Sequence, residues 1–239
     1  MWYYLSFNEG APWSKEVIEK FDERQNLAES EEIYMPEYFI WNPLSQNEGL
    51  PWDSDLIEKY EKKINWEYLS CNRAVPWSED LIERYENRLA WSGPVEIDRG
   101  AGGEVTRNGL SGNEALPWSR SLLERWEDRW DWSQLSENIG LPWSEELLED
   151  YKQRWDWSGL SRNPALPWTE ELIDRYTEKW EWGRRGLSKN GALPWSLELL
   201  EIYSDRWRWR SLPWNRQVYE KAFEEYITSR LIRRVIDTN

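Results

Sequence analysis

The side chains of this 239-residue chain that could carry out chemistry stand mainly in residues 93–109, a segment that interrupts an otherwise regular pattern. The segment holds three acids, and two carboxyl groups about 5–9 Å apart can hydrolyse a glycosidic bond. Its charged side chains could instead contact a partner protein, because irregular segments of a regular scaffold often carry function. We favour this second interpretation and name five candidate partner-binding residues: Glu96, Asp98, Arg99, Glu104 and Arg107.

Composition argues against most catalytic designs. The chain has no histidine, which is the commonest acid–base group near neutral pH and the commonest ligand of transition metals. Its single cysteine, Cys71, can form neither an intrachain disulfide nor a cysteine cluster for zinc, and we expect it to be a small packing residue. The glycine-rich run at 100–103 lacks the lysine of a phosphate-binding P-loop. We therefore predict no enzyme, no metal and no cofactor, with a carboxylate-based hydrolase as an alternative.

Twenty-one tryptophans are the most unusual feature of the composition. Indole rings can stack on the bases of single-stranded nucleic acid, but a net charge of −15 opposes contact with a phosphate backbone. We expect most of the indoles to form the core. The acidity favours a protein partner with a basic surface, and a nucleic-acid-binding or nucleic-acid-mimicking protein remains an alternative.

A Pro-Trp pair occurs eight times and reveals a tandem repeat. The tryptophans of these pairs stand at positions 13, 52, 77, 118, 143, 168, 195 and 214. Three of the seven gaps are 25 residues, and the other gaps of 39, 41, 27 and 19 indicate three insertions and one deletion. A fixed period of this length is typical of a solenoid.

The residue after each Pro-Trp pair predicts the start of a helix. All eight residues belong to the group that caps helix N-termini: Ser14, Asp53, Ser78, Ser119, Ser144, Thr169, Ser196 and Asn215. In one repeat, Leu147, Leu148, Tyr151 and Trp155 lie on one face of a helix of about 12 residues.

The second half of each repeat carries its own pattern. The alternation in Trp155-Asp156-Trp157 predicts an extended or short-strand return after the helix. Ser161 and Asn163 recur at equivalent positions, where their side chains could bond backbone groups of the next turn. The fold class that follows is an α-rich tandem-repeat solenoid, with one helix and one extended return per repeat and a helical C-terminal cap.

The unit resembles tryptophan-rich tandem repeats of uncharacterised bacterial proteins and of large DNA viruses. Those repeats read Leu-Ser-x-Asn-x-x-Leu-Pro-Trp-Ser, followed by Leu-Ile-Glu-x-Tyr and Trp-x-Trp. The matching residues here are Leu135-Ser136-Glu137-Asn138, Trp143-Ser144, Leu147-Leu148-Glu149 and Trp155-Asp156-Trp157. The resemblance covers most of residues 1–214 and implies an architecture but no activity.

Two inserts and the C-terminal end depart from the repeat. We divide the chain into a repeat domain, residues 1–214, with inserts at about 23–38 and 93–109, and a capping helix at 215–239. The first insert predicts a longer helix with a loop, and the second predicts a hairpin around a glycine-rich turn. From residue 205 onward the chain is basic, so residues 1–204 carry a net charge of −18. The acidic body and basic end could support self-association.

The function that we expect from the sequence is binding. A preformed repeat surface loses little entropy when it binds, which suits a non-catalytic protein-binding scaffold or adaptor. By analogy with other repeat scaffolds, it could be an inhibitor, an immunity protein or a defence-related protein. The sequence has neither a signal peptide nor an apolar run long enough to span a membrane, so we expect a cytoplasmic protein without a membrane partner.

Overall fold

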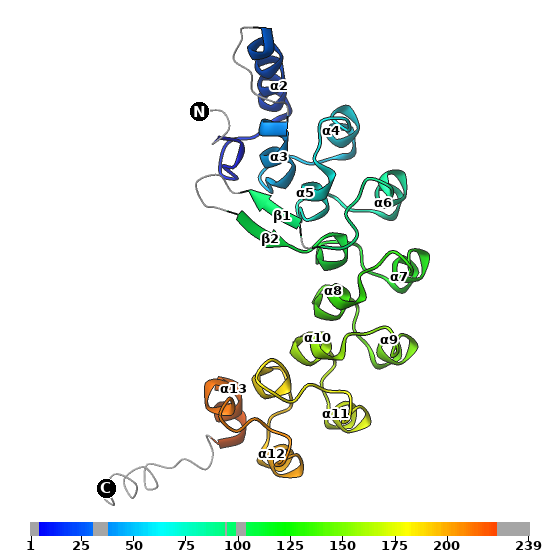
Figure 1. The fold of residues 1–239 in the computed structure, drawn as a ribbon, viewed down its shortest axis with the longest axis vertical. Coiled ribbons are helices and arrows are strands. Elements are labelled where there is room, and N and C mark those ends of the chain that lie inside the picture. Colours follow the sequence, from blue (N-terminus) through cyan, green and yellow to red (C-terminus); the bar gives the residue numbers. More distant parts are fainter. Residues whose placement is uncertain (1–4, 31–37, 94, 99–103, 224–239) are drawn as a thin grey trace, which may run out of the picture. The chain divides into compact units, whose positions relative to one another are not determined.

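The computed structural model describes residues 5–30, 38–93, 95–98 and 104–223, which fall into two compact units, Met1–Gln134 and Leu135–Asn239 (Figure 1). Within each unit, short helices form repeated pairs, and the first and second helices of the pairs lie on opposite sides. The first helices are α2 (Lys15–Ser30), α4 (Ser54–Lys59), α6 (Glu79–Tyr85), α7 (Arg120–Arg125), α9 (Glu145–Asp150), α11 (Glu170–Arg175) and α12 (Leu197–Ile202).

The second helix or helical turn of each pair contains the Leu-Ser pair or its equivalent and ends one or two residues before the recurring asparagine. These elements are α3 (Tyr38–Gln46), α5 (Trp66–Ser70), η2 (Leu110–Gly112), α8 (Trp132–Glu137), α10 (Trp157–Arg162), η3 (Leu187–Lys189) and η4 (Leu212–Trp214). Strands β1 (Val95–Asp98) and β2 (Glu104–Arg107) form a hairpin, and α13 (Arg216–Val218) and η5 (Tyr219–Phe223) close the described chain. In the part of the chain that the structure describes, no helix is long and apolar enough to cross a membrane.

The predicted helix starts are confirmed. The Ser144 hydroxyl accepts a hydrogen bond from the Leu147 amide at 3.1 Å, and the caps at the other Pro-Trp pairs bind a first-turn amide in the same way. These bonds satisfy amides that have no partner within the helix. Leu147 and Leu148 then face the interior and are buried.

The predicted length of the first helix is wrong. The helix after Ser144 ends at Asp150 and does not continue to Trp155. The indole N–H of Trp155 donates to the Leu148 carbonyl at 3.2 Å, and the indole of Trp157 donates to the Lys152 carbonyl at 3.2 Å. Side chains from later positions therefore satisfy carbonyls at the helix end, and the chain can turn early without leaving them unpaired.

The predicted extended return is also wrong, because the second half of the repeat is helical. Asp156 caps α10 by accepting a hydrogen bond from the Ser158 amide at 3.0 Å, and Asn65 caps α5 in a related way. Where the equivalent residue is Glu181 or Arg208, a 3-10 turn follows in place of an α-helix. The alternation of tryptophan and aspartate thus marks a helix cap and not a strand.

The recurring serine joins one turn to the next. The Ser161 hydroxyl donates to the Trp157 carbonyl at 2.6 Å and accepts a hydrogen bond from the Glu181 amide at 2.9 Å. Five other serines accept from the amide 20 residues later: Ser45, Ser70, Ser111, Ser136 and Ser188. All six are fully buried, so each hydroxyl replaces water as the partner of a backbone group.

The recurring asparagine makes the second connection between turns. The side-chain amide of Asn163 donates to the carbonyls of Ser136 and Asn138 at 3.0 and 3.3 Å, and its oxygen accepts from the Ala165 amide. Its own carbonyl accepts the indole N–H of Trp168 at 3.0 Å. The tryptophans of the first seven Pro-Trp pairs are tied in this way to the asparagine five residues before them, and we call the repeated arrangement the asparagine ladder.

The inserts leave the asparagine ladder intact. Asn113 follows Asn72 by 41 residues, yet it donates to the carbonyls of Ser70 and Asn72 as the other ladder residues do. The hairpin predicted within 93–109 is confirmed, with Val95 paired to Arg107 and Asp98 to Glu104 in antiparallel register. The helix predicted within 23–38 is confirmed by α2, and the predicted loop lies outside the described residues.

The eighth Pro-Trp pair does not begin a repeat, which corrects the predicted deletion. Asn215 donates to the Asn190 carbonyl at 3.3 Å, with a separation of 25 residues, so it continues the asparagine ladder. Pro213 and Trp214 therefore occupy the Ser-x positions, and Trp214 is 83% exposed whereas Trp195 is 3% exposed. Asn215 also caps α13, and the predicted terminal helix beyond Phe223 lies outside the described residues.

Replacing Asn163 with alanine is predicted to destabilise the second unit by about 3 kcal/mol, because buried carbonyls and an amide lose their partners. Chemical denaturation should show this loss. Replacing Gln153, an exposed amide side chain of the same unit, is the matched control and should change stability by less than about 0.5 kcal/mol. Equal effects of the two substitutions would contradict the role given to the ladder.

Tyr176 is predicted to make stability fall as the pH rises above 10. Its hydroxyl donates to Glu149 Oε2 at 2.5 Å, and burial together with this bond raises the pKa of Tyr176 from 10.0 to about 12. The folded state therefore holds the proton more tightly, so the contribution is present below pH 10 and is lost between pH 10 and about 12. Denaturation at pH 8, 10 and 11 should show a smaller loss for Tyr176→Phe, and equal losses would refute the prediction.

Candidate functional site

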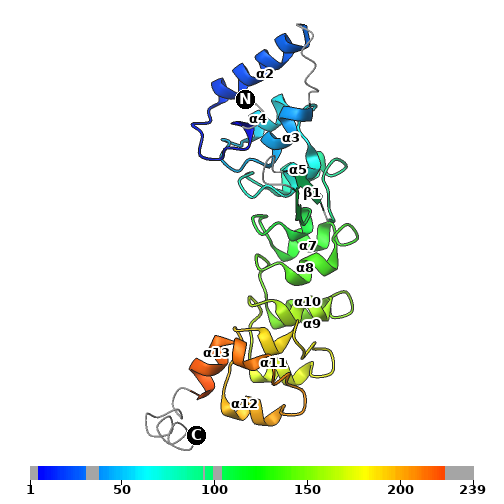
Figure 2. The ribbon, with the colours of Figure 1, turned by 60° about the vertical axis from the view of Figure 1, so that its left-hand side comes forward.

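The hairpin of the second insert packs on the side of the first unit that carries the second helices (Figures 1 and 2). Val95 is 6% exposed and lies in a small cluster with Tyr68 and Cys71, with Ala90 at its edge. Tyr68 belongs to α5 and Cys71 is its C-cap, so β1 lies directly over the end of that helix. The insert is therefore part of the folded unit along this contact.

Glycine allows the two ends of the insert to approach each other closely. A Cβ atom on Gly109 would lie 2.5 Å from the backbone carbonyl oxygens of Ala90 and Ser92. A Cβ atom on Gly93 would lie 3.0 Å from the amide nitrogen of Gly109. Gly109 has no room for a side chain, so glycine is required there for the insert to rejoin the repeat beside the point where it leaves.

An ion pair ties the base of the hairpin to an earlier repeat. The guanidinium of Arg107 lies 3.1 Å from Glu48 Oε1, and both side chains are partly buried, with 26% and 32% exposed. Glu48 follows the ladder residue Asn47 and is 59 residues away from Arg107 in the sequence. A partly buried pair of this kind is screened less by salt than a pair on the open surface.

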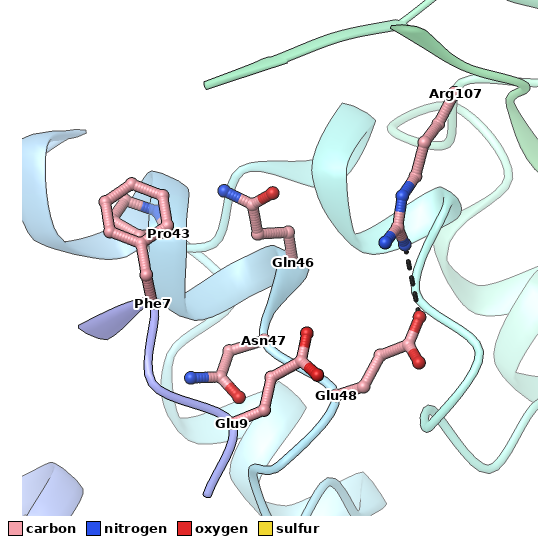
Figure 3. A pocket seen from close by; sticks show the side chains of 7 residues that line it. All are labelled: Phe7, Glu9, Pro43, Gln46, Asn47, Glu48 and Arg107. Carbon is pink, nitrogen blue, oxygen red and sulfur yellow. Dashed lines mark hydrogen bonds and ion pairs between the residues drawn. The ribbon is translucent and has the colours of Figure 1, made fainter. Parts of the chain in front are cut away.

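The same arginine lines a pocket of about 350 Å³ (Figure 3). Phe7 and Pro43 form one wall, Arg107 descends from the other side, and Gln46 lies between them. The pocket is lined by Phe7, Glu9, Pro43, Gln46, Asn47, Glu48 and Arg107. Residues from three distant parts of the sequence thus meet at one opening, which is the usual form of a binding site.

The chemistry of the pocket suits recognition. Arg107 engages one of the two carboxylates, Glu48, and Asn47 uses its side chain in the asparagine ladder. Glu9 remains as an exposed carboxylate that lines the same opening as Phe7. The opening can therefore receive an apolar group on one side and a positively charged or hydrogen-bonding group on the other.

The structure places the five predicted partner-binding residues differently. Arg107 lines the pocket, and Glu96 is exposed on β1 opposite Thr106. Asp98 and Glu104 face each other in the strand register, but their side chains lie outside the described residues, as does all of Arg99. The sequence argument did not identify Phe7, Glu9, Gln46 or Glu48. Phe7 and Gln46 each stand between the recurring serine and asparagine of a repeat, at a position whose residue type differs between repeats. This variation is the sequence signal that could have identified them.

Cys71 is covered by the hairpin and is 5% exposed. Burial raises the pKa of its thiol to about 12, so almost no thiolate is present at neutral pH. This supports the prediction that Cys71 is a packing residue. Within the described ranges, no group of three or more His, Cys, Asp or Glu side chains could hold a metal ion.

Comparison with known proteins adds no family to this description. No family model matches the chain, and neither the curated proteins nor the solved structures include a significant match. The resemblance to tryptophan-rich tandem repeats therefore remains a prediction, and the function has to be argued from the geometry.

Loss of the Arg107–Glu48 pair is predicted to expose Cys71. In the intact protein the thiol should react slowly with a disulfide reagent at pH 8, because it is buried and protonated. Arg107→Ala should speed the reaction as the hairpin loosens. Arg84→Ala removes a similar charge from an exposed pair with Glu58 and should leave the rate unchanged. Fast labelling of the intact protein, or equal rates for both variants, would contradict this account.

Proposed function

We propose that this protein is a non-catalytic scaffold that binds a partner protein on the side formed by the second helices, with the pocket at the hairpin as its specific element. The observation that carries the proposal is the anchored insert. The Arg107–Glu48 pair and the contact of Val95 with Cys71 fix the hairpin beside the pocket. A fixed concave site with mixed polar and apolar lining binds with little loss of entropy.

Within each unit, the repeat supports a surface of its own. We propose that the helix pairs stack as a solenoid within each unit, because the serine hydroxyls and the asparagine ladder join successive turns. The ladder fixes the backbone, while the residue between serine and asparagine changes from turn to turn. In the second unit this residue is Glu137, Arg162 or Lys189, and each has some solvent exposure. A constant scaffold with a variable exposed residue is the arrangement expected of a recognition surface.

The chemistry of the partner follows from charge. The chain carries a net charge of −15, and the pocket holds the exposed carboxylate Glu9 beside Glu48, which forms an ion pair with Arg107. A protein with a basic surface would be attracted over a long range and would find a partner for Glu9 at the pocket. The roles of inhibitor, immunity protein or defence-related protein are all compatible with such binding.

Capture of partners on the immobilised full chain tests the proposal. We expect a protein with a basic binding surface to be retained by the intact chain and by Arg84→Ala, and to bind Arg107→Ala about tenfold more weakly, which corresponds to about 1.4 kcal/mol. Calorimetry with the purified partner gives the ratio. Equal binding of all three proteins would refute the role of the pocket.

A second measurement separates this function from the nucleic-acid and enzyme alternatives. Retention on immobilised single-stranded DNA or RNA that weakens steeply between about 50 and 200 mM salt would favour nucleic-acid binding. Turnover of a glycoside that is lost in Glu9→Gln would favour a hydrolase. We expect neither result.

A further inference from the structure

Exposed large hydrophobic side chains are concentrated in one stretch of the described sequence. Five such residues are more than a third exposed, and four of them lie between positions 202 and 219 in the second unit: Ile202, Trp209, Trp214 and Tyr219. Large apolar side chains that a folded protein leaves exposed can mark interaction sites. Among these four residues, Trp209 says most about a possible partner, because earlier repeats show which side chains cover the equivalent tryptophan.

At inner turns the second indole of Trp-x-Trp is covered by the following turn. The ring of Trp157 lies 4.7 Å from that of Tyr176 and 4.9 Å from that of Trp180, and Lys179 Nζ lies 4.8 Å from its centre. Trp182 has the same neighbours one turn later: Tyr203 at 4.9 Å, Trp207 at 4.8 Å and Arg206 at 5.8 Å. In both cases the indole is covered by an aromatic ring of the following repeat and by a cation three residues after that ring.

The covering turn also makes polar contacts with the turn beneath it. The Tyr203 hydroxyl donates to Asp174 at 3.2 Å, and the guanidinium of Arg206 donates to the Thr177 carbonyl. In the preceding turn, Tyr176 donates to Glu149, and Lys179 donates to the Lys152 carbonyl. Each turn thus presents an acid, a carbonyl and an indole face to the tyrosine and cation of the next.

Trp209 occupies the same position at the last described turn. Its indole N–H donates to the Ser204 carbonyl at 2.8 Å, as that of Trp182 donates to Thr177 at 3.0 Å. Trp209 is 52% exposed, whereas Trp157 and Trp182 are only partly exposed. Glu201, which is equivalent to Asp174, is also exposed. Within residues 135–223, the acid, the carbonyl and the ring face are all present without the tyrosine and cation that cover them in earlier repeats.

The chain does not repeat the covering sequence after Trp209. Between residues 210 and 239, no aromatic residue is followed three positions later by Arg or Lys. A second copy offers Phe21, followed by Arg24 at that spacing, but Phe21 is already 3% exposed and has no hydroxyl for Glu201. The sequence and burial therefore favour an occupant from another protein.

We propose that Trp209, Glu201 and the Ser204 carbonyl form a docking surface for the turn that ends a helix of a partner protein and carries Tyr-x-x-Arg or Tyr-x-x-Lys, as Tyr176 and Lys179 do at the end of α11. The tyrosine ring packs at a tilt against Trp209 and its hydroxyl donates to Glu201. The cation lies over the indole and donates to the Ser204 carbonyl. This surface belongs to the second unit and is separate from the pocket of the first, so the two proposals stand or fall independently.

A peptide with the sequence of residues 169–182 tests the docking surface, because it contains the covering turn around Tyr176 and Lys179. The peptide is labelled with fluorescein and stapled between the exposed positions 171 and 175 to hold the helix. We expect saturable binding to the full chain, weakened about tenfold by Trp209→Ala, since both the ring contact and the cation contact are lost. Trp214→Ala removes an even more exposed indole and serves as the matched control, with binding unchanged within about twofold.

Changes in the peptide test the stated chemistry. Tyr176→Phe should weaken binding through the lost bond to Glu201, and Lys179→Ala should weaken it through the lost cation. In the protein variant Glu201→Gln, Tyr176→Phe in the peptide should weaken binding less, because the bond from the tyrosine hydroxyl to the Glu201 carboxylate is already lost. Absence of binding at about 1 mM peptide, or equal binding by Trp209→Ala, would overturn the proposal.

Two further outcomes would assign the surface to this chain itself. Acrylamide quenching of tryptophan fluorescence can be compared between the intact protein and Trp209→Phe. If the substitution does not remove an accessible, strongly quenched indole, the chain already covers Trp209. If the protein self-associates in sedimentation and Trp209→Ala abolishes this, a second copy is the occupant. Either result overturns the proposal, and the pocket in the first unit would be unaffected.

Discussion

The side-chain amide of Asn163 is the contact on which the repeat depends. It donates to two carbonyls of the preceding turn and accepts an amide of its own turn, and the carbonyl of the same residue receives the indole of Trp168. A buried backbone turn without such partners would cost about 1–3 kcal/mol for each unpaired group. One residue type therefore allows a series of very short helices to bury the segments that connect them, and it also fixes where the next Pro-Trp pair must stand.

This ladder gives the repeat a direction. Ladder asparagines such as Asn163 and Asn190 donate to the repeat before them, and the recurring cations Lys179 and Arg206 reach back to a carbonyl of the preceding repeat. The two faces of a turn are therefore chemically different: one offers acids, carbonyls and an indole face, and the other offers a tyrosine and a cation. Because of this polarity, an uncovered turn at the C-terminal side specifies the chemistry of whatever can stack on it.

The sequence predicts the features that depend on neighbouring residues and fails on those that depend on distant ones. Ser144 and its equivalents cap helices because a cap needs only the next three residues. The helix end was missed because Trp155 must reach back to the Leu148 carbonyl, and the second helix was missed because Asp156 was taken as part of an alternating strand. The pair of Arg107 with Glu48 spans 59 residues, so no local pattern could reveal the pocket.

The error at Pro213-Trp214 has the same origin and carries a functional consequence. Counting Pro-Trp pairs treats the motif as the repeat, whereas the structure defines the repeat by which asparagine donates to which carbonyl. Once Asn215 is placed on the ladder, Trp214 stands at the variable position between serine and asparagine, where Glu137, Arg162 and Lys189 stand in earlier turns. A tryptophan that is 83% exposed at a variable position cannot be explained by the core, since the core does not contact it. Trp214 therefore belongs with the exposed residues at the variable position, and it is not part of the docking surface formed by Trp209, Glu201 and the Ser204 carbonyl.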